Sequence, residues 1–161
     1  VLARSGYFDV SELDKFRNIN SRLQGHPTTH EGLPVIRIAS GSLGQGMSVA
    51  IGAAETKKLN NDDKIIYSLH GDGELQEGQI WEAALYASAK KVDNLICTID
   101  VNGQQIDGST DKVMNMGSLE DKFTAFGFDV LVEKNGNDLN HIIKTLTELP
   151  NPLVIHSRQA M

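Results

Sequence analysis

Two polar side chains stand at the ends of two predicted β-strands. Asp72 follows the β-rich run 64–69, and Asn102 follows the apolar run 95–100. The stretch 79–91 between them is Ala-rich and helical, which completes one strand–helix–strand crossover. If the two strands are neighbours, a carboxylate oxygen and an amide oxygen converge at one sheet edge. Hard oxygen ligands of this kind suit Mg²⁺, with Ca²⁺ as a possible substitute, and do not suit zinc.

Two side chains cannot complete an octahedral site. The remaining positions call for water, a backbone carbonyl and the phosphate oxygens of a ligand. Gly71 and Gly73 flank Asp72, so the backbone can approach a ligand closely at this turn. An Asp-Gly pair by itself is more often a plain turn, and the metal interpretation therefore depends on the two strand ends meeting.

A glycine-rich loop supplies the third chemical element. Residues 41–46 read Gly-Ser-Leu-Gly-Gln-Gly and open a predicted helix. Such a loop can present backbone N–H groups to a phosphate or to a cofactor ring. It is not a P-loop, since no Gly-Lys-Ser/Thr follows. It also matches the dinucleotide fingerprint poorly, because no strong strand precedes it and no ribose-binding acid is suitably placed.

The elements that must position these residues alternate along the chain. Ser11 followed by Asp14 predicts a helix start. Further helices are predicted at 45–58, 79–91, 118–127 and 138–149, the last stopped by Pro150, and strands at 64–69, 95–99, 128–132 and 153–155. Short strands separated by helices predict an α/β fold with a parallel sheet flanked by helices. The apolar strands indicate burial on both sheet faces, and ligands in such sheets bind at the carboxyl ends of the strands.

Composition excludes several classes of protein. The chain has 161 residues, with 40% hydrophobic and 22% charged residues, which suits a globular domain. Its net charge of −6 argues against a nucleic-acid partner, because a polyanion is repelled. No stretch has the roughly 18 apolar residues that cross a membrane, and no signal peptide is visible. The single cysteine, Cys97, rules out an internal disulfide and is expected to be buried. A reducing cytoplasmic setting fits these features.

The order of the motifs resembles that of a known family. Gly71-Asp72-Gly73 followed about thirty residues later by Asn102 resembles the thiamine diphosphate motif. The longer string 71–83 is similar to transketolases, and so are Gln24–Pro27, the loop 41–46 and Gln105–Gly108. These matches run in family order from about Tyr7 to Ile155.

The resemblance implies a role for each matching residue. Asp72 and Asn102 would bind Mg²⁺ through their side chains, and Gln104 through its backbone carbonyl. His26 would contact the C1 hydroxyl of the donor sugar. Glu77 would lie at a subunit interface near the activating groups of the cofactor. The expected cofactor-binding residues are Gly41, Ser42, Leu43, Gly71, Asp72, Gly73, Glu74 and Asn102.

The resemblance also implies a reaction and a partner. The family transfers a two-carbon ketol unit between sugar phosphates, with thiamine diphosphate as the electron sink. Its activating glutamate belongs to a separate pyrimidine-binding domain, for which this chain offers no candidate. The expected partner is therefore a C-terminal transketolase subunit, as in split transketolases, or the rest of a longer polypeptide. A homodimer or a heterotetramer is expected.

We expect residues 1–161 to form a single thiamine diphosphate-binding domain of the type that holds the diphosphate. This domain is expected to be truncated at both ends, since the chain starts at Val1 without Met and residues 156–161 do not match the family. The family's upstream Ser/Lys-Gly-His segment is also missing.

Two alternative functions and several side chains stay open at this point. The alternatives are another thiamine enzyme, such as deoxyxylulose phosphate synthase, and an isolated cofactor-binding subunit that is inactive without a partner. His70 either reaches the cofactor or fills the strand end. His30 is expected to face solvent, and His141 and His156 to be structural or exposed. Trp81 and Tyr86 are expected to pack in the core or at an interface.

Overall fold

The computed structural model describes residues 1–147 with their side chains and the backbone of residues 153–158. The chain separates into two compact units, Val1–Leu43 and Gly44–Met161, and each is described by itself. The expectation of a single domain over residues 1–161 stays a prediction.

The first unit consists mainly of loops with two short 3₁₀-helices, η1 (Ala3–Ser5) and η2 (Val10–Lys15). The helix predicted from Ser11 exists as η2, but its cap is Asp9, whose carboxylate accepts a hydrogen bond from the Ser11 N–H at 2.8 Å. Arg22 forms a two-point ion pair with Glu12 at 2.8 Å. This pair ties η2 to the segment that precedes the Gln24–Pro27 motif.

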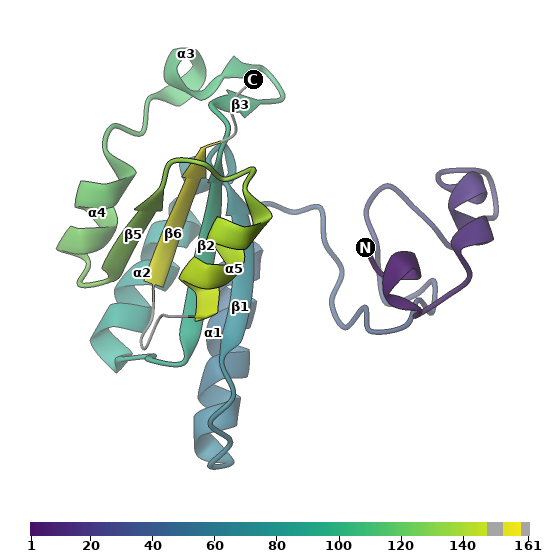
Figure 1. The fold of residues 1–161 in the computed structure, drawn as a ribbon, viewed down its shortest axis with the longest axis horizontal. Coiled ribbons are helices and arrows are strands. Elements are labelled where there is room, and N and C mark those ends of the chain that lie inside the picture. The colour runs from purple at the N-terminus through teal and green to yellow at the C-terminus, as the bar shows by residue number, and fades with distance from the viewer. Residues whose placement is uncertain (148–152, 159–161) are drawn as a thin grey trace. The chain divides into compact units, whose positions relative to one another are not determined.

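A four-stranded parallel sheet forms the centre of the second unit (Figure 1). Its strands are β1 (Ile66–Gly71), β2 (Leu95–Val101), β5 (Asp129–Glu133) and β6 (Leu153–Arg158), in the order β1-β2-β6-β5. Every neighbouring pair is parallel, which confirms the predicted α/β class. The strands shift by one or two residues from the predicted bounds, and β6 continues to Arg158.

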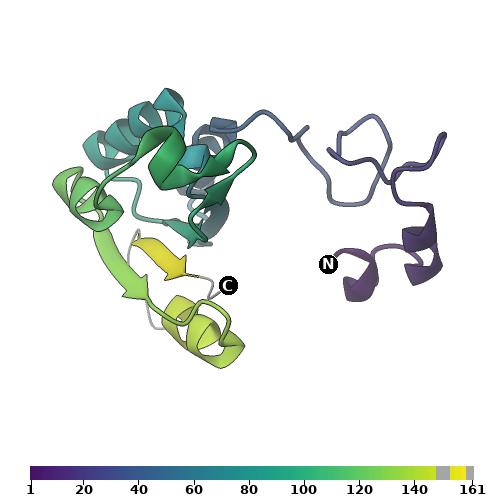
Figure 2. The same ribbon diagram turned by 90° about the horizontal axis from the view of Figure 1, so that it is seen from above.

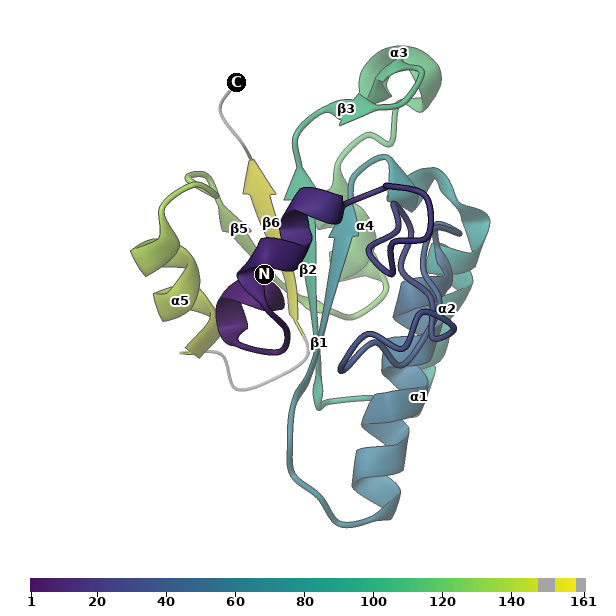
Figure 3. The same cartoon turned by 90° about the vertical axis from the view of Figure 1, so that its right-hand side faces the viewer.

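Helices cover both faces of this sheet. Figures 2 and 3 show α1 (Gln45–Leu59) and α2 (Gly78–Lys90) on one face and α5 (Leu139–Thr147) on the other. The chain moves from β1 to β2 in one direction along the sheet and returns from β5 to β6 in the other. Right-handed crossovers then require opposite faces for α2 and α5. The predicted stop of the last helix at Pro150 lies outside the described residues.

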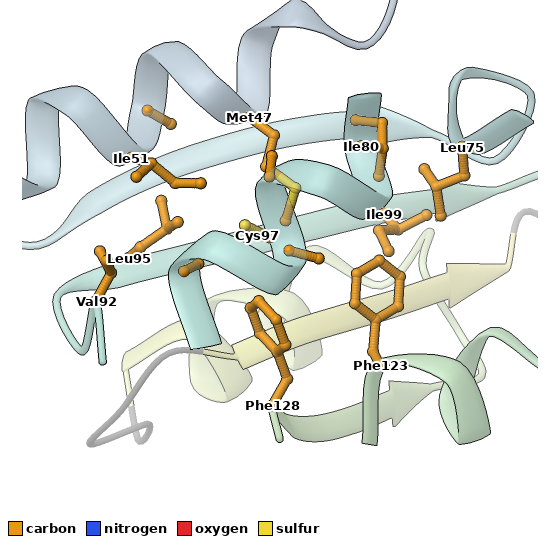
Figure 4. Close-up of a cluster of buried hydrophobic side chains, with 14 of the residues drawn as sticks. Met47, Ile51, Leu75, Ile80, Val92, Leu95, Cys97, Ile99, Phe123 and Phe128 are labelled. Atoms are coloured by element: carbon orange, nitrogen blue, oxygen red, sulfur yellow. The ribbon is translucent and has the colours of Figure 1, made fainter. Parts of the chain in front are cut away.

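The apolar core lies between the sheet and the helices on the α1/α2 face (Figure 4). Met47 and Ile51 of α1 meet Leu95, Cys97 and Ile99, which are alternate residues of β2. Phe123 and Phe128 close the cluster from α4 (Leu119–Ala125) and from the turn that follows it. The buried position predicted for Cys97 is confirmed.

Burial on both sheet faces is correct for β2 and wrong for β1. In β2, Leu95 and Ile96 point to opposite faces and each is 1% exposed. In β1, Tyr67 is 57% and Leu69 is 72% exposed. These two side chains point away from α1 and α2, toward the opposite face of the sheet. Among the described residues of the second unit, α5 is the only helix on that face.

Short helices and strands follow the carboxyl ends of β1 and β2 (Figure 1). These are η3 (Glu74–Gln76), the two-residue strands β3 (Gln104–Gln105) and β4 (Gly108–Ser109), and α3 (Thr110–Met114). The sequence patterns predicted none of them. Among the described helices, none has the length and apolar character that a membrane crossing needs.

Candidate functional site

The register of β1 and β2 brings the two predicted strand ends together. Gly71 pairs with Asp100, and the Asp72 N–H donates to the Asp100 carbonyl at 3.1 Å. The turns that follow the two strands are therefore adjacent. The crossover deduced from the sequence is confirmed by this pairing, which brings the Asp72 turn beside the loop that starts at Asn102.

Asp72 is a buried carboxylate that accepts three hydrogen bonds. Its Oδ2 accepts from the Gly103 N–H at 2.9 Å and from the Thr110 hydroxyl at 3.4 Å, and its Oδ1 accepts from the Gly73 N–H at 3.0 Å. The residue is only 4% exposed. Within residues 1–147 no Lys, Arg or His forms an ion pair with it. A buried anion without a counter-charge is costly, so this geometry favours a bound cation.

Asn102 lies at the start of the loop that covers Asp72. Its Oδ1 accepts from the Gln104 N–H at 2.9 Å, and its Nδ2 donates to Asp100 Oδ2 at 3.3 Å. An amide oxygen has two lone pairs, so Oδ1 keeps capacity for a second partner. The loop turns at Gly103, which has a φ of +72°.

A glycine follows Asp72 because the neighbouring loop leaves no room for a side chain at Gly73. A Cβ atom on Gly73 would lie 2.7 Å from Gln105 Cβ and 3.6 Å from the Gln104 carbonyl oxygen. The backbone turn thus packs directly against the loop. The three predicted metal ligands, Asp72, Asn102 and the Gln104 carbonyl, come from two adjacent turns.

The donor types also limit the kind of metal. The described residues hold no group of three or more His, Cys, Asp or Glu side chains suited to a metal ion. A metal at this edge would use one carboxylate, one amide oxygen and one backbone carbonyl, with oxygens of a ligand and water completing it. That set is typical of Mg²⁺.

Glu74 connects the Asp72 turn to the start of α1. Its Oε1 accepts from the Gly44 N–H at 2.8 Å, and its Oε2 lies 3.2 Å from His70 Nδ1. Burial pushes the pKa of the Glu74 carboxyl upward, but the contacts with His70 and with the Gly44 and Gly71 N–H groups outweigh it, so the pKa lies below its usual value. Glu74 is therefore held as a carboxylate.

Gly44 sits where the glycine-rich loop becomes α1. It has a φ of +84°, and a Cβ there would lie 2.8 Å from Gln79 Cγ and 2.9 Å from Glu77 Cβ. Glu77 is the exposed N-cap residue of α2, and its side chain makes no capping hydrogen bond. The expected interface role of Glu77 is compatible with this exposure and stays a prediction.

The remaining predicted site residues belong to the first unit. His26 and Gly41 lie side by side there: Gly41 has a φ of +118°, and a Cβ on it would lie 2.9 Å from His26 Cγ. The Ser40 N–H donates to the Pro27 carbonyl at 3.0 Å and holds the two segments together. Ser42 and Leu43 follow and are exposed. The expected roles of these four residues stay predictions.

The structure also shows the exposure and packing of other histidines and of Trp81. His30 is exposed, as predicted, and so is His141, which lies 3.7 Å from a Glu133 oxygen. The His156 side chain lies outside the described residues. Trp81 packs on Phe123 and Phe126, with ring centroids at 5.2 and 5.9 Å. The packing role predicted for Trp81 is confirmed.

The sequence patterns did not predict the hydrogen-bond partners of Asp72 and Glu74. Thr110 and Gly103, which bond to Asp72, carry no motif that marks them. His70 had two open interpretations. It is buried at the end of β1 beside Ser68 and Glu74, and its contact with the cofactor stays untested. One sequence signal could have indicated the contact between His70 and Glu74. It is a histidine directly before Gly-Asp-Gly, with a glutamate four residues after the histidine.

Comparison with known proteins identifies the family. The model of the family "Transketolase, thiamine diphosphate binding domain" matches residues 1–152. This chain belongs to the transketolase family. Its strand-end aspartate and asparagine therefore lie within that family's thiamine diphosphate binding domain.

Relatives in the transketolase family include single subunits. An apulose-4-phosphate transketolase subunit of Phocaeicola vulgatus is 40% identical over 162 residues, which cover 97% of this chain and 57% of that protein. The "6-deoxy-6-sulfo-D-fructose transketolase subunit SqwG" of a Clostridium species is 37% identical, covering 91% of this chain and 53% of that protein. The chain thus spans about half the length of the curated relatives it matches.

Solved transketolases share the fold. The structure of the Campylobacter jejuni transketolase matches with a TM-score of 0.81 and 34% identity, covering 94% of this chain and 25% of that one. The predicted architecture, a parallel sheet flanked by helices in a thiamine diphosphate-binding domain, is confirmed.

Proposed function

We propose that this chain is the diphosphate- and metal-binding part of a transketolase that transfers a two-carbon ketol unit between sugar phosphates. The observation that carries the proposal is the buried Asp72 carboxylate, which has no paired cation among the described side chains and lies against the loop that starts at Asn102. The family membership of the chain supports it.

The residues present fit a Mg²⁺–thiamine diphosphate group. Asp72 and Asn102 would hold Mg²⁺ by their side-chain oxygens, and Gln104 by its carbonyl. Gly73 would approach the diphosphate with its backbone. Gly71 and Glu74 would flank the same group. Gly41, Ser42 and Leu43 are also proposed to contact the cofactor.

When bound, thiamine diphosphate supplies a carbon nucleophile and an electron sink for the two-carbon unit. The chain's own residues bind and orient. Asp72 supplies negative charge for the metal, which offsets the diphosphate charge. His26 would hold the donor sugar by its C1 hydroxyl, and precise holding of this kind contributes to rate by fixing the reacting geometry. Glu77 would act from the subunit interface.

A partner follows from the roles that this chain does not fill. The activating glutamate expected for this family belongs to a pyrimidine-binding domain. Two relatives, of which this chain covers 57% and 54%, are themselves named as subunits of a transketolase. We therefore propose a C-terminal subunit or further domain as the partner, in a homodimer or a heterotetramer.

The substrates are proposed to be sugar phosphates or closely related anionic sugars. Two relatives are named for apulose 4-phosphate and for 6-deoxy-6-sulfo-D-fructose. Both names describe a sugar with an anionic group at one end. A donor panel for this chain therefore includes these two sugars beside xylulose 5-phosphate, with ribose 5-phosphate as the acceptor.

The test is a coupled transfer assay of the protein with Mg²⁺ and thiamine diphosphate, run alone and with its candidate C-terminal partner. We expect turnover only when the partner is present, because the activating glutamate comes from it. No turnover on any donor with the partner bound would overturn the transferase proposal. It would favour the second candidate, a cofactor-binding subunit that has lost its reaction.

A further inference from the structure

A buried chain of polar side chains runs from the core to the start of α1. His70 is 4% exposed, and its Nε2 lies 3.1 Å from the Ser68 hydroxyl. That hydroxyl in turn lies 3.3 Å from the sulfur of Cys97, which is 1% exposed. The histidine ring is thus anchored from the core side by its Nε2 atom.

The contacts of the Ser68 hydroxyl fix the orientation of the histidine ring. Ser68 Oγ lies between the Cys97 sulfur and His70 Nε2. The opposite ring nitrogen, Nδ1, therefore faces the Glu74 carboxylate.

Glu74 uses both of its oxygens to bridge two elements. Oε2 lies 3.2 Å from His70 Nδ1, and Oε1 accepts from the Gly44 N–H at 2.8 Å. The Nδ1 contact is not a well-aligned hydrogen bond, and Nδ1 has no other partner among the described residues. The Glu74 side chain is 13% exposed, so these contacts replace most of its water.

Gly44 is the N-cap of α1. Glu74, 30 residues further along the chain, accepts the hydrogen bond of the Gly44 N–H, a role that a glutamate in the first turn of the helix plays in a capping box. Gly46, in the first turn of the helix, packs on the same histidine: a Cβ atom there would lie 3.6 Å from His70 Cε1. The pair thus holds the first turn of α1 against the Asp72 turn.

We propose that His70 is a positioning residue, which acts through Glu74 to fix the start of α1 relative to the Asp72 turn. The consequence for cofactor affinity rests on the proposed function, whereas the structural link does not. His70 makes no contact with substrate or cofactor in this role.

The test compares two substitutions of His70 in the purified protein. His70→Leu removes both ring nitrogens, whereas His70→Asn places an amide N–H near the Nδ1 position. We expect the Gly44 amide to exchange hydrogen about tenfold faster in the Leu variant and close to the original rate in the Asn variant, because one charge-assisted contact holds it. Amides of β2 serve as the reference for global stability.

Binding of Mg²⁺–thiamine diphosphate is then measured on the same proteins by calorimetry. We expect the dissociation constant to rise about tenfold in the Leu variant and to recover in the Asn variant, as expected when one charge-assisted contact is lost. Glu74→Gln is the second probe if the Leu variant does not fold, and it too is expected to speed exchange at Gly44.

The outcomes separate the two proposals. Unchanged Gly44 exchange in both His70→Leu and Glu74→Gln overturns the positioning role, and so does an Asn variant that behaves like Leu. Absence of Mg²⁺–thiamine diphosphate binding in the unsubstituted protein overturns the proposed function instead. In that case the exchange data still decide the link between His70, Glu74 and Gly44.

Discussion

Asp72 is the residue on which the proposed metal site depends. Its carboxylate is buried, accepts hydrogen bonds from two backbone N–H groups and one hydroxyl, and has no cationic partner in residues 1–147. Neutral donors orient a carboxylate without cancelling its charge. A divalent cation would cancel it, and would also recruit an anionic ligand.

Cys97 provides a prediction at the residue scale. Burial raises the pKa of its thiol to about 11, against a partly offsetting hydrogen bond with Ser68. Folded protein treated with dithionitrobenzoate at mildly alkaline pH should therefore react only at the rate of unfolding, while urea-unfolded protein reacts at once. Rapid reaction of the folded protein would contradict the buried position.

The same thiol has a defined effect on stability. Because its pKa is raised in the folded state, the stabilising contribution is fully present below the unfolded value of about 8.5. It is lost as the pH rises toward the folded pKa of about 11. Cys97→Ala should flatten this part of the stability profile, measured by urea unfolding across that pH range.

Individual residues of the candidate site differ in how far their positions could be predicted from the sequence. Asp72 and Asn102 were predictable because each follows a strong strand pattern, so topology alone brings them together. Thr110 and Gly103 were not, since a hydrogen bond to a carboxylate 31 or 38 residues earlier leaves no local pattern. Glu74 was predicted beside the cofactor, whereas its bond to Gly44 depends on tertiary packing.

At the scale of elements, α1 is the best-predicted helix. Its predicted start at Gln45, entered from Gly44, is confirmed, and its end differs by one residue. The reason is local: a left-handed glycine is a strong helix boundary. The two-residue strands β3 and β4 were missed because such short strands have no alternation of polar and apolar residues to detect.

Two glycines at the start and in the interior of α1 give a matched pair of substitutions. Gly44→Ala should lower the free energy of unfolding by about 2 kcal/mol, because it strains a left-handed residue and crowds its neighbours. The new methyl group would meet Gln79 and Glu77. Gly52→Ala should raise the free energy of unfolding by about 0.5–1 kcal/mol, because alanine is the better helix former. Nothing lies within 4 Å of a new Cβ at Gly52.

Urea unfolding of the two variants checks this pair. Similar effects of the two substitutions would contradict the geometry at the start of α1. Since Gly52 is exposed and a Cβ atom there would meet no other atom within 4 Å, its substitution should also leave binding at the Asp72 turn unchanged.

At the scale of the whole molecule, the fold was largely predictable, whereas the exposure of one face of β1 was not. Parallel order followed from alternating strands and helices. The exposure of Tyr67 and Leu69 did not, because an apolar strand has the same sequence whether or not another element covers it. The match to about half of each relative's length leaves room in such proteins for further structure.

At this scale, the proposed function implies that the active site is divided between this chain and a partner. The chain carries residues suited to the metal and the diphosphate, while the group that activates the reactive ring is expected on a partner. Cofactor binding and turnover should therefore be separable properties. We expect binding to depend on the Asp72 turn and turnover to require the proposed complex with a partner.

The most direct test of the proposed metal site is calorimetric titration of thiamine diphosphate into the protein, with Mg²⁺ and with chelator, for Asp72→Ala and for the exposed control Asp63→Ala. We predict Mg²⁺-dependent binding that Asp72→Ala abolishes and that Asp63→Ala changes by no more than about twofold. Unchanged affinity in Asp72→Ala would contradict this assignment.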